Sequence, residues 1–253
     1  MTERHDVRIE KLVYGGKGLA HLDGKHTMFV SGALPGELVR AVVLHKRKGI
    51  YEAQAEQILE PSADRVPPPC NGDLECTGAT WPHIAYPAQL RFKQEILLDA
   101  LRRTGGMEPR RPLPILASPR QDHYRLRTQF NVRSKDGVQR IGFFRQGSYD
   151  LIEVENGFLL HPLIDKTVRA VRKHVRLLPP ITEAHINASP AGEVHILLFG
   201  EEKALPPQDA FFAALVADVP EVIGITGFTR KKKSFSLGKN TLALHVDGLT
   251  LHA

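Results

Sequence analysis

Residues 66–83 read VPPPCNGDLECTGATWPH, and this stretch divides the chain. It contains three consecutive prolines, both cysteines of the chain (Cys70 and Cys76) and its one tryptophan, Trp81. Proline lacks an amide hydrogen and fixes φ, so three prolines in a row cannot continue a helix or a central strand. We therefore predict a linker over 63–86, with a strand-rich domain before it and a domain of mixed helices and strands after it.

The bulk composition is that of a globular chain long enough for two domains. The chain has 253 residues, of which 42% are hydrophobic and 25% charged. No apolar run approaches the roughly 20 residues that a membrane span needs, and the polar N-terminus has no signal-peptide core. Two cysteines do not make a secreted disulfide framework. We expect a cytoplasmic monomer without a membrane partner.

The net charge of +6 favours a polyanionic partner, because the basic residues are clustered while the acidic ones are dispersed. A basic surface with no partner is the alternative. The basic clusters are 46–48, 102–103, 110–111 and 230–233.

Residues 1–62 read as several short strands separated by glycine turns. Residues 7–14 alternate between apolar and polar side chains, as a half-buried strand does. Asp23-Gly24 and Pro35-Gly36 are turn signals. So many short strands in one small domain indicate a closed barrel of the OB type, which has no free edges. Gly15 to Gly18 form a bend rather than a phosphate loop, because no helix follows them.

Residues 87–253 read as a second domain that opens with a helix. Pro87 suits a first helical position, and the pair Gly105-Gly106 ends the helix. The spacing predicts an apolar face of leucines, namely Leu90, Leu97, Leu98 and Leu101. Further helices are predicted over 162–178 and 209–217, with strands between and after them.

A strand meander is predicted over 123–154. Its first strand carries Arg125, Arg127 and Arg133 at one parity, so these side chains project from one face. The opposite parity carries Tyr124 and Phe130 with other apolar residues. A polyanion-facing sheet explains this row, and a solvated sheet face is the alternative.

No catalytic constellation is predicted from the residues themselves. The chain lacks the dinucleotide fingerprint, the nucleophile elbow and the His-Glu-x-x-His zinc motif. Cys70, Cys76 and His83 could begin a zinc site, but a structural zinc needs four ligands and no second pair is present. A Cys70–Cys76 disulfide is the other reading, and it would need an oxidising setting.

Several segments resemble the RNA (uracil-5-)methyltransferase family. EKLVYGGKGLA at 10–20 and FVSGALPGE at 29–37 are similar to its TRAM domain, an OB-like RNA-binding module. The resemblance to the central domain of these enzymes runs through QLRFK at 89–93, YRLR at 124–127, IGFFRQGS at 141–148 and LLHP at 159–162. It implies a multidomain chain: an N-terminal all-β OB-like barrel, then an α+β central domain.

Two departures from the family pattern bear on cofactors. The family holds a four-iron cluster on four cysteines; Cys70 and Cys76 match two of them, while Ala79 and Gly157 stand at the others. We therefore predict no iron–sulfur cluster. The family's C-terminal Rossmann-like domain binds S-adenosylmethionine and carries the catalytic cysteine and base, and this chain reaches only Ala253. We expect that domain and its cofactor site to be absent, and the chain alone to be inactive.

The resemblance thus predicts the RNA-binding N-terminal portion of an S-adenosylmethionine-dependent RNA (uracil-5-)methyltransferase of 23S ribosomal RNA. The alternatives are a stand-alone RNA-binding protein without catalysis and a decayed relative; transfer RNA also stays open as the substrate. The residues expected to bind RNA are Lys11, Lys17, Arg40, Lys46, Arg47 and Lys48 on the barrel, and Tyr124, Arg125, Arg127, Phe143 and Arg145 in the central domain. For each aromatic residue, a place in the core is the alternative.

Overall fold

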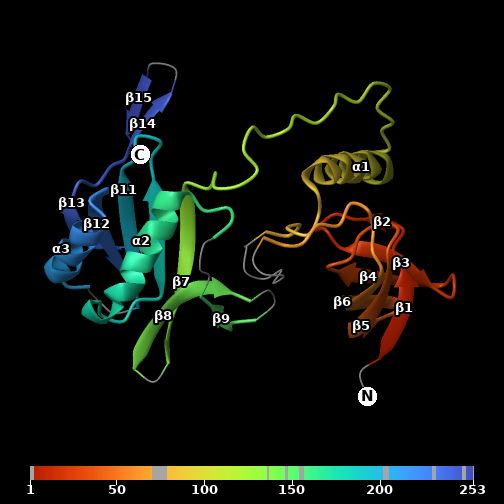
Figure 1. Cartoon of the computed structure of the whole chain (residues 1–253), viewed down its shortest axis with the longest axis horizontal. Coiled ribbons are helices and arrows are strands. Elements are labelled where there is room, and N and C mark those ends of the chain that lie inside the picture. The colour runs from red at the N-terminus through yellow and green to blue at the C-terminus, as the bar shows by residue number, and fades with distance from the viewer. Residues whose placement is uncertain are drawn as a thin grey trace. The chain divides into compact units, whose positions relative to one another are not determined.

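The computed structural model describes residues 3–69, 79–135, 137–145, 148–153, 157–201, 205–229, 232–246 and 249–252. The chain divides into two compact units, with unit 1 ending at Pro119 and most of unit 2 following it. Figure 1 labels the elements of both. Unit 1 contains β1 (Arg4–Arg8), β2 (Lys11–Leu12), β3 (Gly18–Leu22), β4 (His26–Ser31), β5 (Leu38–Arg47), β6 (Ile50–Glu60) and α1 (Tyr86–Gly105).

Unit 1 is built on a sheet that closes on itself. Its strand order is β1-β5-β6-β4-β3-β2. β1 and β2 are successive pieces of one extended segment, and the first pairs with β5 while the second pairs with β3. The two ends of the sheet are therefore joined through the chain itself. Side chains that point inward, such as Met28, Val30 and Val39, are fully buried and fill the interior.

Helix α1 belongs to unit 1 and covers a second, smaller hydrophobic cluster. Ala88 and Phe92 of the helix pack with Leu12, Leu34 and Ile84. The barrel leaves Leu12 and Leu34 for the helix to cover, so unit 1 extends beyond the strands of residues 1–62. The sequence groups this helix with the domain that begins at residue 87, whereas the structure groups it with unit 1.

The buried face of α1 differs from the predicted leucine face. Ala88 and Phe92 are buried and Ile96 packs beside them, whereas Leu97 is 59% exposed. Spacing alone does not choose between two apolar stripes on one helix. Packing decides which stripe is buried, because Phe92 contacts the cluster that contains Leu12 and Leu34. The helix ends as predicted, with Gly106 in the left-handed region at φ 60°.

A fully buried carboxylate, Glu37, holds two loops of unit 1 together. It accepts hydrogen bonds from the backbone amide of Leu34 (2.8 Å) and from the Arg65 guanidinium (2.6 and 2.8 Å). Arg65 also donates to the carbonyl oxygen of Gly32 (2.8 Å). Both charges are thus paired inside the fold, as buried charges must be.

Trp81 packs within unit 1 against the turn between β2 and β3. Its indole Nε1 donates to the carbonyl oxygen of Gly16 at 3.3 Å. Gly16 has φ +81°, and a Cβ there would lie 2.3 Å from that same Nε1. Glycine is needed at this position both for the backbone conformation and for the close approach of the indole.

Unit 2 is a mixed sheet with two helices. Its strand order is β13-β12-β11-β10-β7-β8-β9, with a separate pair β14-β15. The helices pack on one face through residues such as Ile164 and Phe211, and Figure 1 shows α2 crossing that face. The elements are β7 (Arg127–Lys135), β8 (Val138–Phe144), β9 (Leu151–Ile152), α2 (Pro162–Lys173), a 3₁₀ turn (Val175–Leu177), β10 (Glu183–Ala188), β11 (Val194–Gly200), α3 (Asp209–Asp218), β12 (Val222–Thr229), β13 (Lys232–Gly238), β14 (Ala243–Val246) and β15 (Leu249–His252).

Strand β7 shows the predicted division of its two faces. Phe130 and Val132 are buried under the helices, while Arg127 and Arg133 are exposed on the other side. The basic residues of α2 are mostly tied to neighbours, for example Lys166 to Glu221. In the part of the chain that the structure describes, no helix is both long and apolar enough to cross a membrane.

We predict that Glu37→Gln lowers the free energy of unfolding by roughly 3 kcal/mol, because it leaves the Arg65 charge without its buried partner. Equilibrium urea unfolding followed by Trp81 fluorescence measures the change. Glu60→Gln is the matched control: Glu60 pairs with Arg8 at the surface, where the loss should stay below about 1 kcal/mol. Equal losses in the two variants would contradict the role given to Glu37.

His83 provides a pH test of unit 1. Burial first, and the nearby Arg65 charge second, lower the pKa of its imidazole from 6.5 to about 4. Between these values the unfolded chain binds a proton that the folded chain does not, so stability falls as pH is lowered from 6.5 to 4. His83→Leu should show a shallower fall over this range in the same unfolding assay. Identical slopes for the two proteins would count against a buried, neutral His83.

Candidate nucleic-acid interface

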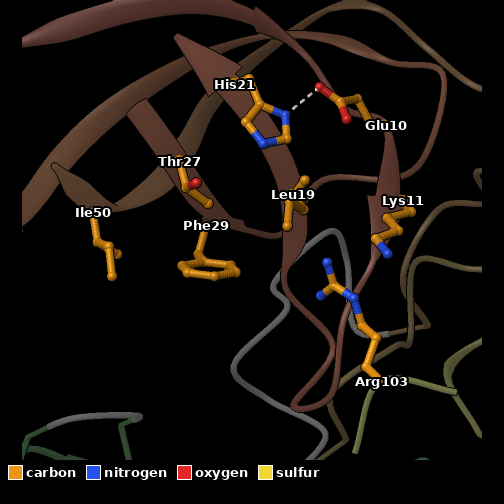
Figure 2. A pocket seen from close by; sticks show the side chains of 8 residues that line it. All are labelled: Glu10, Lys11, Leu19, His21, Thr27, Phe29, Ile50 and Arg103. Carbon is orange, nitrogen blue, oxygen red and sulfur yellow. Dashed lines mark hydrogen bonds and ion pairs between the residues drawn. The ribbon is translucent and has the colours of Figure 1, made fainter. Parts of the chain in front are cut away.

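An open pocket lies on the outer surface of the unit 1 sheet, and Figure 2 shows its side chains. We call it the outer pocket. Its volume is about 470 Å³, within the range of roughly 300–1,000 Å³ typical of small-ligand sites. It is lined by Glu10, Lys11, Leu19, His21, Thr27, Phe29, Ile50 and Arg103.

Strand register explains why these residues meet. Phe29 on β4 is paired with Leu19 on β3, and Leu19 is paired in turn with Lys11 on β2. A second row runs beside it, in which Thr27 is paired with His21 on one side and Ile50 on the other. Because neighbouring residues of a strand face opposite sides, Met28 and Val30 point into the barrel while Thr27 and Phe29 point outward.

Charged groups surround this apolar floor. Asp99 of α1 accepts a hydrogen bond from Lys11 (3.1 Å) and lies 3.8 Å from Arg103, so one carboxylate holds both cations at the pocket. On another side, the Nδ1 of His21 is 2.7 Å from the carboxylate of Glu10, as the dashed line in Figure 2 shows. The pocket therefore combines an aromatic ring, two cations and a polar pair.

A basic hairpin adjoins the pocket. Lys46, Arg47 and Lys48 are exposed where β5 turns into β6. Lys48 and Gly49 both have positive φ (48° and 78°), which is the two-residue turn that suits a twisted hairpin. Arg47 is paired in register with Ile50, the residue that reaches the pocket. The hairpin and the outer pocket thus form one continuous surface of unit 1.

The predicted barrel cations differ in how free they are. Arg40 makes two hydrogen bonds with the Asp6 carboxylate (2.8 and 2.9 Å), which lower the pKa of Asp6. Lys17 donates a hydrogen bond to the carboxylate of Glu52 (3.1 Å), and Glu52 is the residue paired with Phe29 in the sheet. The Nζ of Lys46 lies 4.5 Å from the centroid of the Tyr51 ring. A hydrogen bond between Lys46 and Tyr51 raises the pKa of Lys46. For Arg47 and Lys48 the described residues provide no ion-pair partner, so these two are best placed to meet an external anion.

In unit 2, the predicted residues around 124–127 lie beside the 157–161 loop. The amide of Arg125 donates to the carbonyl oxygen of Leu159 (2.9 Å), and the amide of His161 donates to the carbonyl oxygen of Arg125 (3.0 Å). Two segments that resemble the family's motifs are thus neighbours. Tyr124 is 48% exposed and Arg127 is exposed at the start of β7.

The other predicted residues of unit 2 lie on β8 and just after it. Phe143 is half-buried against the core, with its ring centroid 4.9 Å from that of Phe130. Arg145 is exposed, and its amide donates to the carbonyl oxygen of Asp150 (2.9 Å). The position of Phe143 favours the core alternative, whereas Arg145 stays accessible.

Two of the four expected cluster positions, Ala79 and Gly157, lie among the described residues. Cys70 and Cys76 lie outside the described residues. At Gly157 a Cβ would lie 2.4 Å from the Cδ1 of Leu160, so the loop has no room for a cysteine side chain as it is packed. Ala79 and Gly157 offer no thiolate, and the residues present do not fit a four-cysteine cluster. Over the described ranges, no group of three or more His, Cys, Asp or Glu side chains could hold a metal ion.

Of the eight residues that line the outer pocket, only Lys11 was predicted. The seven that were not predicted are Glu10, Leu19, His21, Thr27, Phe29, Ile50 and Arg103. In TMFV at 27–30 three apolar residues follow one another, which hides the two-residue period. One signal was available: Phe29 shares its parity with Thr27 and Ser31, so it belongs to the outward face. Nothing in the sequence places Arg103 at the pocket, since that depends on how α1 packs.

Comparison with known proteins places this geometry in context. No family model matches the chain. It is 35% identical over 76% of its length to an "Uncharacterized RNA methyltransferase" of Aquifex aeolicus, covering 44% of that protein. It is 34% identical over 65% of its length to a 23S rRNA (uracil(1939)-C(5))-methyltransferase RlmD of Methylococcus capsulatus, covering 37% of that protein. The chain thus spans about half the length, or less, of these relatives.

A solved structure has the same fold. The Pyrococcus abyssi tRNA (uracil-54, C5)-methyltransferase, in complex with S-adenosyl-L-homocysteine, matches 98% of this chain and 58% of its own, with a TM-score of 0.69 and 18% identity. The predicted fold class, an all-β OB-like barrel and an α+β central domain without a methyltransferase domain, is therefore wrong. The chain is a mixed α/β structure with two main sheets, and nearly all of it has the fold of a part, 58%, of this methyltransferase.

The comparisons give no sign that a catalytic domain has been lost, and they do not support the predicted inactivity of the chain. The similarity covers most of the sequence and is accompanied by a shared fold. Over most of its length, this chain is similar in sequence to proteins named as RNA methyltransferases, among them 23S rRNA (uracil(1939)-C(5))-methyltransferases.

Proposed function

We propose that the chain is the RNA-binding portion of an S-adenosylmethionine-dependent RNA (uracil-5-)methyltransferase that acts in the cytoplasm. The observation that carries the proposal is the surface of unit 1, where the basic hairpin at 46–48 meets the outer pocket. Cations bind phosphates without regard to sequence, and aromatic rings stack on bases. Homology to RNA methyltransferases makes RNA the polyanion that fits this surface.

Ribosomal RNA is the favoured substrate. Relatives named as 23S rRNA methyltransferases are 34% and 36% identical to the chain, whereas the tRNA enzyme of known structure is 18% identical. Enzymes that modify a base take it out of its stack, and the flanking nucleotides must then be held in place. We assign to this chain the role of holding these flanking nucleotides.

Within unit 1, Arg47 and Lys48 would make the strongest phosphate contacts, because they are exposed and have no ion pair in the described structure. Lys11, Lys17 and Lys46 would add weaker ones, since each already has a carboxylate nearby. Arg40 is held by Asp6 and would contribute least.

Within unit 2, the exposed residues Tyr124, Arg127 and Arg145, together with the partly exposed Arg125, would bind further nucleotides. Phe143 is left out of this set because its ring packs against Phe130.

S-adenosylmethionine would supply the methyl group in the whole protein. We assign none of the described residues to its binding. An iron–sulfur cluster is not included, because two of the four expected positions are Ala79 and Gly157. That exclusion stays a prediction, which iron analysis of anaerobically purified protein would test.

The salt dependence of RNA binding tests the proposal. For a single strand, the slope of log affinity against log salt changes by about 0.7 for each phosphate contact. We therefore expect Arg47→Gln combined with Lys48→Gln to reduce the slope by about 1.4 and to weaken binding at low salt. Fluorescence anisotropy with a labelled single-stranded 23S rRNA fragment gives the measurement.

Arg40→Gln is the matched control, since Arg40 is on the same barrel but is already paired with Asp6. It should change the slope much less than the double variant does. An unchanged slope in the double variant, or an affinity of the unmodified chain that is insensitive to salt, would contradict the proposed function.

A further inference from the structure

The outer face formed by β3, β4 and the start of β6 is more apolar than the fold requires. The barrel interior is already filled by inward side chains, including Met28 and Val30 at 0% exposure. Phe29 and Ile50 lie on the opposite side of the sheet, and Ile50 is 48% exposed. Apolar side chains that serve no core are a sign of a binding surface when polar groups surround them.

The groups around this floor match the parts of a nucleotide. The ring of Phe29 offers a flat face on which a base can stack. Lys11 and Arg103 share the single carboxylate of Asp99, so the three groups together leave one net positive charge for a phosphate. The pair Glu10–His21 on another wall offers hydrogen-bonding atoms for the edge of a base. Figure 2 shows Phe29, the two cations and the Glu10–His21 pair around the same space.

We propose that the outer pocket holds one unstacked base of single-stranded RNA, with Phe29 as the stacking surface. The inference rests on the proposed RNA-binding function and names the nucleotide contact within it. A base within a strand is favoured over a free small ligand because the basic hairpin adjoins the pocket through the Arg47–Ile50 pair. A phosphate backbone that follows Arg47 and Lys48 would bring its next base to Ile50 and Phe29.

The test uses the full chain and a single-stranded RNA in which one adenine is replaced by 2-aminopurine and both flanking nucleotides are abasic. The probe then has no adjacent base to stack on, so its fluorescence falls when it stacks on the protein. Binding to the unmodified chain should quench the probe. Phe29→Leu keeps a large apolar side chain but removes the aromatic face, and it should abolish the protein-dependent quenching and weaken binding about tenfold. Phe29→Tyr should retain both properties.

Tyr14→Ala is the control, since Tyr14 is a more exposed aromatic residue of unit 1 that does not line the pocket. It should leave quenching and affinity unchanged. The fluorescence of Trp81 confirms that each variant is folded. Quenching that survives Phe29→Leu, or that is lost in Tyr14→Ala instead, would overturn the inference.

Two further outcomes separate this inference from the proposed function. If Phe29→Leu behaves like the unmodified chain while the Arg47/Lys48 double variant binds weakly, the pocket inference fails and the RNA-binding function stands. If the unmodified chain binds no RNA, both fail. Equal quenching of free 2-aminopurine ribonucleotide and of the oligonucleotide, at the same base concentration, would identify a small-ligand site and overturn the inference.

Discussion

The buried ion pair between Glu37 and Arg65 is the interaction on which unit 1 depends. It fixes the loop before β5 against the segment that leaves β6. That segment then holds the start of α1, because the amide of Ala85 donates to the carbonyl oxygen of Asp64 (2.9 Å) and Arg91 pairs with the Asp64 carboxylate. Helix α1 in turn places Asp99 and Arg103 beside the outer pocket. Through these contacts, the buried carboxylate of Glu37 helps to position the charged rim of the candidate site.

The number of basic residues is a poor guide to where an anion binds. Most cations of unit 1 are engaged by carboxylates, and such exposed pairs add little to stability. They do lower the local positive potential, so a paired residue such as Arg40 attracts phosphate less than Arg47 does. In this protein, cations that are already paired with carboxylates therefore differ from Arg47 and Lys48, which lie at the hairpin tip without such a partner among the described residues.

Local features of this chain could be predicted from its sequence. The two faces of β7 follow from alternation, and the end of α1 follows from Gly105-Gly106, because both depend on nearby residues. The buried face of α1 and the place of that helix in unit 1 could not be predicted, since both depend on packing against Leu12 and Leu34. Part of the candidate site was within reach: Lys11 and the basic hairpin were predicted, while Phe29 and Arg103 required strand register and helix docking.

If the proposals above hold, RNA lies across the basic hairpin and the outer pocket of unit 1. Photocrosslinking of the chain to a 23S rRNA fragment containing 4-thiouridine, followed by mass spectrometry of the crosslinked peptides, tests it most directly. We expect the crosslinks in unit 1 to concentrate in the segments 19–29 and 46–50. Crosslinks in unit 1 confined to the surface around Arg4, Arg8 and Arg40, or no crosslinks in unit 1 at all, would contradict it.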